Sequence, residues 1–147
     1  MKKFVCLLVV IAFVAFAAKS TNLRIKSNKR KVIYVLNTSW YGPGFHGKKT
    51  ASGNTYNMYK LTAAHRTWPF GKRLILTNPI NNKSTTVTIN DRGPYDPDYL
   101  TGNNKKLVPH PNRDLDISFE AARQLGIVRK GVSTLLVEIA EPQKLIQ

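Results

Sequence analysis

The alternation of apolar and polar positions predicts four short strands. Residues 32–40 begin with β-branched and aromatic side chains, which favour a strand. Residues 72–78 are centred on a continuous apolar run, and residues 84–90 alternate apolar with polar positions. Asn and Pro residues between these two runs are typical of a turn, so we expect them to form a β-hairpin. Residues 132–140 alternate again and are the last expected strand.

One short segment has helical rather than strand periodicity. Phe119, Ala122 and Leu125 recur at spacings of three, which places them on one face of a helix. Ser118 precedes them and is a preferred helix-capping residue, while Gly126 follows and favours the end of a helix. The pattern therefore predicts a short helix directly before the last strand.

Two long segments lack any periodicity. Residues 41–57 carry several glycines among small polar residues, and residues 93–113 contain four prolines around a polar tip at residues 102–106. We expect both to be loops, with Asp96 and Asp98 as turn residues. Short strands, one helix and long loops indicate a mainly β domain, namely a small β-barrel with the helix packed at its rim.

The first residues are typical of an export signal. Lys2 and Lys3 precede an uncharged apolar run over residues 4–18, which is shorter than the ~20 residues of a membrane-spanning helix. Ala15 and Ala17 form an A-x-A cleavage pattern. We expect residues 1–17 to be a signal peptide, with an uncleaved anchor as the alternative, and the protein to be secreted or periplasmic.

The remaining chain divides by composition into three parts. Residues 18–31 carry several basic residues and no acidic one, so they are expected to be a basic linker that contacts an anionic wall or membrane, or else a solvated tail. Residues 32–141 are the expected barrel domain, and residues 142–147 are a C-terminal tail.

Composition excludes several classes of protein. The chain has 147 residues, which suit one domain, and 23 Lys and Arg against 8 Asp and Glu give a net charge of +15. Outside the cytoplasm the available polyanions are wall polymers and anionic lipids. Because the sequence also has no nucleic-acid-binding motif, we do not expect nucleic acid as a partner. The alternative is that the charge only keeps the protein soluble. The single cysteine, Cys6, excludes a disulfide framework and a cysteine zinc site.

Few residues can carry acid–base chemistry. Asp91 follows an alternating strand and precedes a Gly-Pro turn, so it is expected at the barrel rim; an ion pair with Arg92 or a local turn bond is the structural alternative. Asp116 lies near the predicted helix N-terminus, which is expected to lower its pKa. His65 adjoins an aromatic cluster and most simply belongs to the framework. None of the histidines forms a metal-binding pattern, so no metal or other cofactor is expected.

Six motifs occur in an order that resembles the RlpA-like family of rare lipoprotein A proteins. They are SWYGPGFHG (39–47), TASG (50–53), LTAAH (61–65), PFG (69–71), NDRGPY (90–95) and DLDIS (114–118). The resemblance spans about residues 38–139. It implies a six-stranded double-psi β-barrel related to expansins, and an enzyme that cleaves MurNAc–GlcNAc bonds of naked peptidoglycan strands by lytic transglycosylation, acting as a monomer.

The resemblance also implies roles for particular residues. Asp91 matches the family's acid/base and His65 a residue that orients or polarises the substrate, whereas Asn54 stands where the family has Glu. Asn cannot exchange a proton at neutral pH, so it would orient a sugar by hydrogen bonds. The expected substrate-binding residues are Asn54, Trp40, Tyr41, Phe45 and Asp116. For the three aromatic residues, core packing is an equal alternative.

Two departures leave alternatives open. If the missing Glu is indispensable, the chain is a non-catalytic peptidoglycan-binding or expansin-like wall module; a weaker alternative is a basic, wall-targeting or host-directed secreted protein on the same barrel. Residues 95–114 also form a longer segment than the family has, and it either contacts glycan or is a tolerated surface insertion.

Overall fold

The computed structural model describes residues 31–98 and 103–141. The expected signal peptide, almost all of the basic linker and the C-terminal tail lie outside these residues. In chain order the elements are β1 (Ile33–Tyr41), the 3-10 helix η1 (Pro43–Phe45), β2 (Thr62–Ala64), β3 (Arg73–Thr77), β4 (Ser84–Asp91), β5 (Tyr95–Asp98), β6 (Asn103–Pro109), β7 (Leu115–Ser118), α1 (Phe119–Leu125) and β8 (Val132–Ile139).

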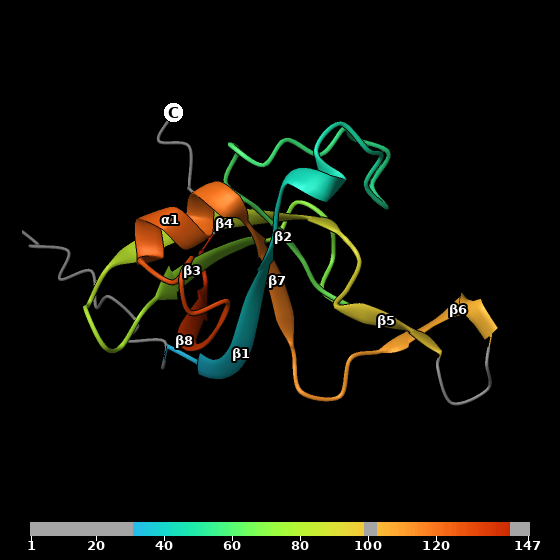
Figure 1. The fold of residues 1–147 in the computed structure, drawn as a ribbon. Coiled ribbons are helices and arrows are strands. Elements are labelled where there is room, and N and C mark those ends of the chain that lie inside the picture. The colour runs from blue at the N-terminus through green and yellow to red at the C-terminus, as the bar shows by residue number, and fades with distance from the viewer. Residues whose placement is uncertain (1–30, 99–102, 142–147) are drawn as a thin grey trace, which may run out of the picture.

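Six of the strands close into a barrel in the order β1-β7-β2-β4-β3-β8, with β8 returning to β1 (Figure 1). This confirms the predicted six-stranded, mainly β barrel. Two pairings are parallel, β1 with β7 and β2 with β4, and the others are antiparallel. The fully buried core is aliphatic and includes Leu74, Leu76, Ile89, Ile117 and Leu135.

Helix α1 packs against this core at one end of the barrel. Its Ala121, Ala122 and Leu125 are buried, and the Ser118 side chain accepts a hydrogen bond from the backbone N–H of Ala121. Gly126 ends the helix in the left-handed conformation, which glycine adopts without steric cost. The predicted helix and both of its end signals are therefore confirmed.

The predicted strands at residues 32–40, 72–78, 84–90 and 132–140 correspond to β1, β3, β4 and β8, and β3 and β4 form the expected hairpin. Strands β2 and β7 were not predicted. They have three and four residues, too few for an alternating pattern to stand out. Their residues are buried because other strands pair with them on both sides. This burial is a property of the closed barrel and not of the local sequence.

The prediction that residues 93–113 form a loop was wrong for most of that segment. β5 and β6 pair with each other in a separate two-stranded sheet that projects from the barrel like an arm (Figure 1). Asp98 is not a turn residue, because it lies in β5 with only 4% of its surface exposed and forms an ion pair with Lys106 at 3.3 Å. The prolines did not prevent pairing, since strands that have an open edge tolerate them.

Within the part of the chain that the structure describes, no helix has the length and apolar character needed to cross a membrane.

Candidate functional site

The site predicted from the sequence is assembled where β4, β2, β7 and β1 run side by side. Ala64 on β2 pairs with Asp91 on β4 and with Asp116 on β7, and Asp116 in turn pairs with Ser39 on β1. A bulge between Ala63 and Ala64 shifts the register so that Ala64 lies opposite Asp91. Bulges commonly redirect a side chain beside a functional site. Asp91 and Asp116 therefore share one cross-strand row, on either side of a small residue.

Asp91 is anchored by backbone groups and not by a cation. Its Oδ1 accepts hydrogen bonds from the backbone N–H groups of Ala51 and Arg92, both at 2.8 Å. Among the described residues, no hydrogen bond or ion pair reaches Oδ2. The Arg92 guanidinium is directed elsewhere: it lies 3.7 Å from the Phe70 ring centroid and donates to the carbonyl of Trp68 at 2.9 Å. The structure therefore does not contain the alternative ion pair between Asp91 and Arg92.

His65 directly follows β2 and is fixed beside Asp91 by its backbone, whose N–H donates to the Asp91 carbonyl at 3.3 Å. Its Nδ1 accepts hydrogen bonds from the backbone N–H groups of Thr67 at 3.2 Å and Trp68 at 3.0 Å. Burial, followed by the nearby charges of Arg66 and Arg92, lowers the pKa of His65 to about 4. The imidazole is therefore neutral at neutral pH, and its single ring proton is on Nε2.

Asn54 is brought to the same end of the barrel by a tight loop. Its carbonyl accepts a hydrogen bond from the Thr50 N–H at 2.8 Å, while the Ser52 N–H donates to the carbonyl of Asn90 beside Asp91. The Asn54 side chain is exposed and donates to the Ser52 hydroxyl at 3.1 Å. Together with the Ala51–Asp91 hydrogen bond, these contacts tie the loop of residues 50–54 to the end of β4.

Asp116 is held on one oxygen only. The Ser39 hydroxyl donates to Oδ1, and Nη1 of Arg113 lies 3.8 Å from the same atom. A Cβ added to Gly93 would lie 3.7 Å from Oδ2 and 3.8 Å from the Cβ of Ala64, so Oδ2 is directed toward the turn that follows Asp91. No described residue donates a hydrogen bond to Oδ2.

The expectation of a lowered pKa for Asp116 was wrong, because burial raises it. The hydrogen bond from Ser39 and the charge of Arg113 act in the opposite direction but do not outweigh burial. The helix N-terminus two residues later is close in sequence and could be predicted. The neighbouring strands β1 and β2, which exclude water from this carboxyl group, come from distant parts of the chain.

Arg113 connects this site to the arm formed by β5 and β6. Its Nη2 lies 3.0 Å from Asp96 on β5, and its Nη1 donates to the Ser39 hydroxyl at 3.2 Å. His110, just beyond β6, lies 3.5 Å from the other oxygen of Asp96. Neither Arg113 nor the role of Asp96 was predicted from the sequence. No local pattern signals these residues, because the contacts exist only once the arm has formed.

The three aromatic candidates differ in exposure. Trp40 packs edge-to-face on Phe119 and donates its indole N–H to the Val128 carbonyl at 3.3 Å. Packing within the domain therefore explains the presence of Trp40. Tyr41 stacks on the buried ring of Tyr56, with centroids 4.3 Å apart. Phe45 is 54% exposed, with Lys48 Nζ 5.3 Å from its ring. A role in sugar contact stays a prediction for all three, and Phe45 is the most exposed of them.

The Tyr41 hydroxyl interacts electrostatically with both carboxyl groups. It is buried next to the side chain of Thr62, which acts to lower its pKa. Burial and the neighbouring Tyr56 raise the pKa of Tyr41, and the charges of Asp91 and Asp116 both add to this effect. Burial likewise raises the pKa of Tyr56 to about 12. Both phenols are therefore neutral at physiological pH.

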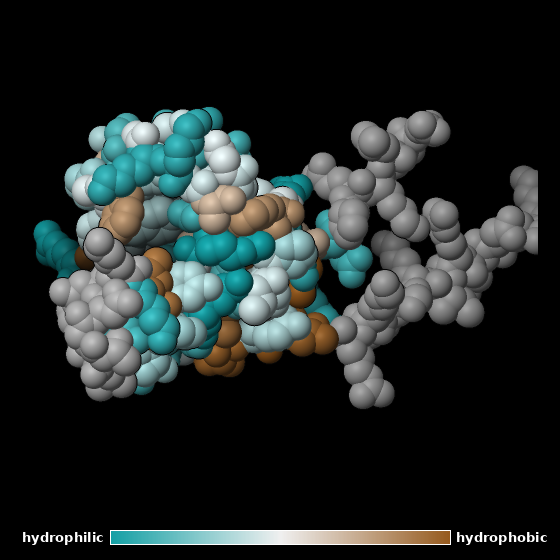
Figure 2. Space-filling view, turned by 90° about the vertical axis from the view of Figure 1, so that its right-hand side faces the viewer, coloured by the Kyte–Doolittle hydropathy of each residue, from teal (hydrophilic) through white to brown (hydrophobic). Residues whose placement is uncertain are grey.

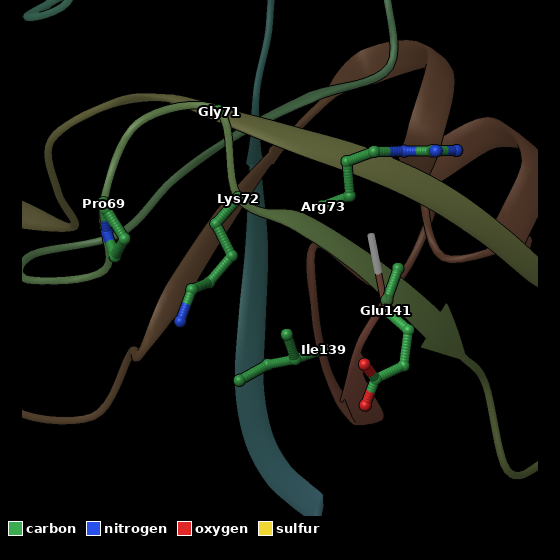
Figure 3. Close-up of a pocket in the computed structure, with 7 residues that line it drawn as sticks. Pro69, Gly71, Lys72, Arg73, Ile139 and Glu141 are labelled. Atoms are coloured by element: carbon green, nitrogen blue, oxygen red, sulfur yellow. The ribbon is translucent and has the colours of Figure 1, made fainter. Parts of the chain in front are cut away.

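A pocket of about 330 Å³ lies elsewhere, between the start of β3 and the end of β8. Figure 3 shows Lys72 and Glu141 on either side of Ile139, with the Arg73 side chain directed away from them. The lining residues are Pro69, Gly71, Lys72, Arg73, Ile139, Ala140 and Glu141. None of them is a predicted site residue. The face on the side of the arm, which Figure 2 shows, is mostly hydrophilic with small apolar patches.

Comparison with known proteins gives consistent family matches. A family model described as lytic transglycolase matches residues 33–137. An RlpA protein of Synechocystis sp. is 47% identical over 70% of this chain and 28% of its own length. The endolytic peptidoglycan transglycosylases RlpA of Campylobacter jejuni and Vibrio cholerae are 44% and 37% identical, over 69% and 86% of this chain and 32% and 44% of their own lengths. The chain thus spans less than half of each of these relatives.

Two solved structures share the fold at low sequence identity. The Streptomyces papain inhibitor has a TM-score of 0.54 at 14% identity, covering 75% of this chain and 96% of that protein. A mutant of the Clavibacter michiganensis expansin in complex with cellohexaose has a TM-score of 0.53 at 15% identity, covering 77% of this chain and 53% of that one. At these identities the likeness concerns the fold alone.

Proposed function

Because the chain belongs to the RlpA-like lytic transglycolase family of double-psi β-barrels, we propose that it is a peptidoglycan lytic transglycosylase. The reaction cleaves the MurNAc–GlcNAc bond of a glycan strand stripped of stem peptides and leaves a 1,6-anhydro end. The relatives from C. jejuni and V. cholerae are named for endolytic peptidoglycan transglycosylation. Since peptidoglycan lies in the cell envelope, the proposal places this chain there, exported by the signal predicted at residues 1–17.

One observation carries the proposal: the state of Asp91. Its Oδ1 is fixed by two backbone N–H groups, while Oδ2 has no partner among the described residues. A carboxyl group in that state is oriented and still able to exchange a proton. In lytic transglycosylation the C6 hydroxyl of the muramyl residue attacks C1, and no water is consumed. One carboxyl group can therefore protonate the leaving oxygen and remove the hydroxyl proton.

His65 supports this chemistry as a neutral hydrogen-bond donor. With Nδ1 filled by two backbone N–H groups, its remaining polar atom is Nε2–H. Its pKa of about 4 keeps it uncharged where a wall enzyme works. We assign it the role of orienting or polarising the glycan, and not of taking a proton.

The test is product analysis with the purified chain and peptide-free glycan strands. Mass spectrometry should find 1,6-anhydro ends with the wild type. Asp91→Asn should lower their rate of formation by about 10²–10⁴-fold, the usual contribution of general acid–base catalysis. Asp114→Asn makes the same chemical change at a residue that pairs with Arg66 instead, and should leave the rate nearly unchanged. If Asp91→Asn forms 1,6-anhydro ends at the wild-type rate, the assignment of Asp91 as the catalytic carboxyl group is wrong.

A second candidate function is a non-catalytic, expansin-like wall-binding module. It is favoured by Asn54, whose exposed amide occupies the position of the family's Glu and cannot exchange a proton. Glycan binding by the wild type without any anhydro product would support this function over the first.

A further inference from the structure

The site holds a second carboxyl group that is arranged like the first. In Asp91 and in Asp116, Oδ1 accepts every hydrogen bond that the described residues donate to the carboxyl group, and Oδ2 receives none. The two residues flank Ala64 in one row of three strands. Because neighbouring strands lie about 4.8 Å apart, their backbones are about 10 Å apart. The residue between them in this row is the small Ala64, and a Cβ built on Gly93 would lie 3.8 Å from the Ala64 Cβ and 3.7 Å from Asp116 Oδ2.

The other polar groups at this site cannot supply a proton. Asn54 is an amide, and His65 is neutral with its Nδ1 filled. The phenols of Tyr41 and Tyr56 have raised pKa values, and the Tyr41 hydroxyl is buried. Among the described residues of the row and its neighbouring loop, Asp91 and Asp116 are therefore the groups that remain as candidates for proton transfer.

The surroundings of Asp116 suit a carboxyl group that holds a proton and then releases it. The groups that act on it are Ser39 and Tyr41 on β1, Arg113 before β7, Asp96 on β5 and His110 just beyond β6. Burial, which outweighs the others, favours the neutral acid. Once the proton has left, the Arg113 guanidinium 3.8 Å away and the Ser39 hydroxyl stabilise the carboxylate that remains.

We propose that Asp116 is the general acid of this site and Asp91 its base, so that two carboxyl groups divide the work that the family's Glu would otherwise share. This inference rests on the proposed function. The Asp116 proton moves to the glycosidic oxygen as its bond to C1 breaks. The muramyl C6 oxygen then bonds to C1, and its proton moves to Asp91. Asp91 returns one proton to solvent and Asp116 takes one up, so the overall reaction consumes neither water nor a proton.

The test compares kcat for peptide-free glycan strands across a range of pH in the wild type, Asp116→Asn and the matched control Asp114→Asn. We expect Asp116→Asn to lower kcat by at least about 10²-fold while glycan binding is retained, because Asn still accepts the Ser39 hydrogen bond. We also expect the fall in wild-type kcat on the alkaline side to disappear in Asp116→Asn, since that limb reports loss of the acid's proton. A purely structural role would change the rate without removing this limb.

The outcomes separate the two proposals. If the wild type makes anhydro ends and Asp116→Asn is as active as Asp114→Asn, the role of Asp116 is overturned and the proposed function stands. If the wild type makes no such ends, both are overturned. Where Asp116→Asn fails to fold, NMR titration of the Asp116 side-chain carbon in the wild type decides. An ionisation at or below the ordinary pKa of 3.8 overturns the acid assignment, and one above it supports the assignment.

Discussion

The imidazole of His65 stacks on the indole of Trp68, with ring centroids 4.1 Å apart and ring planes 13° apart. The same two residues are joined by the hydrogen bond from the Trp68 backbone N–H to Nδ1. This arrangement leaves the imidazole half-buried and occupies one of its nitrogens. It therefore explains why a histidine beside Asp91 behaves as a fixed neutral donor.

The first prediction follows from this contact. In an NMR titration the His65 ring should stay neutral until the pH falls to about 4, because burial and the charges of Arg66 and Arg92 lower its pKa. Trp68→Ala should raise that pKa toward the ordinary 6.5 by admitting water to the ring. A His65 that titrates near 6.5 in the wild type contradicts the neutral-donor role.

The second prediction concerns Arg92, which is adjacent to Asp91 but serves the framework. Its guanidinium bonds the carbonyls of His65 and Trp68 and covers Phe70. Arg92→Ala leaves these carbonyls without a donor, so it should lower the free energy of unfolding by about 2–4 kcal/mol. Chemical denaturation measures this.

Arg123→Ala is the control for that measurement. Arg123 is itself exposed and pairs with Glu120 of its own helix, so its removal should have little effect. If both arginine variants unfold at the same denaturant concentration, the framework role of Arg92 is wrong.

The sequence predicted those parts of the fold whose causes are local. The strand at residues 84–90 alternates because one face of β4 is buried, and Ser118 and Gly126 bound a helix through their own backbone chemistry. β2 and β7 were missed because their burial depends on closure of the barrel. The arm was missed because Pro97 and Pro109 resemble loop residues until Asp96 and Asp98 acquire their ion pairs.

The candidate site could be predicted residue by residue but not as an arrangement. The motif resemblance indicated Asp91, His65 and Asn54, and the structure brings all three to one end of the barrel. The anchoring of Asp91 by Ala51 and the link from Asp96 through Arg113 to Asp116 join segments far apart in the chain. The pKa of Asp116 was predicted with the wrong sign for the same reason, since burial depends on the packed neighbours.

The third prediction tests Asn54, which the motif resemblance places where the family is expected to have Glu. Asn54→Glu introduces a carboxyl group at the end of the loop that Ala51 ties to Asp91. If proton transfer limits the rate, the release of 1,6-anhydro ends should rise by about 10-fold or more, a part of the usual acid–base contribution. Asn54→Gln keeps the amide and should leave the rate as it is. Equal rates in the two variants would remove any acid–base role from this position.

The fourth prediction uses stability to examine Asp116 without substrate. Burial raises its pKa above the ordinary 3.8, so between these two values the folded protein holds a proton that the unfolded chain has lost. The stabilisation from this group is therefore complete below pH 3.8 and is lost as the pH rises through the higher, folded value. Asp116→Asn removes that loss, so the variant should gain stability over the wild type between acid and neutral pH. Denaturation at several pH values measures the difference, with Asp114→Asn as the reference. A difference that does not change with pH would show that Asp116 ionises as an ordinary surface carboxyl group, and a site tuned to hold a proton would then be excluded.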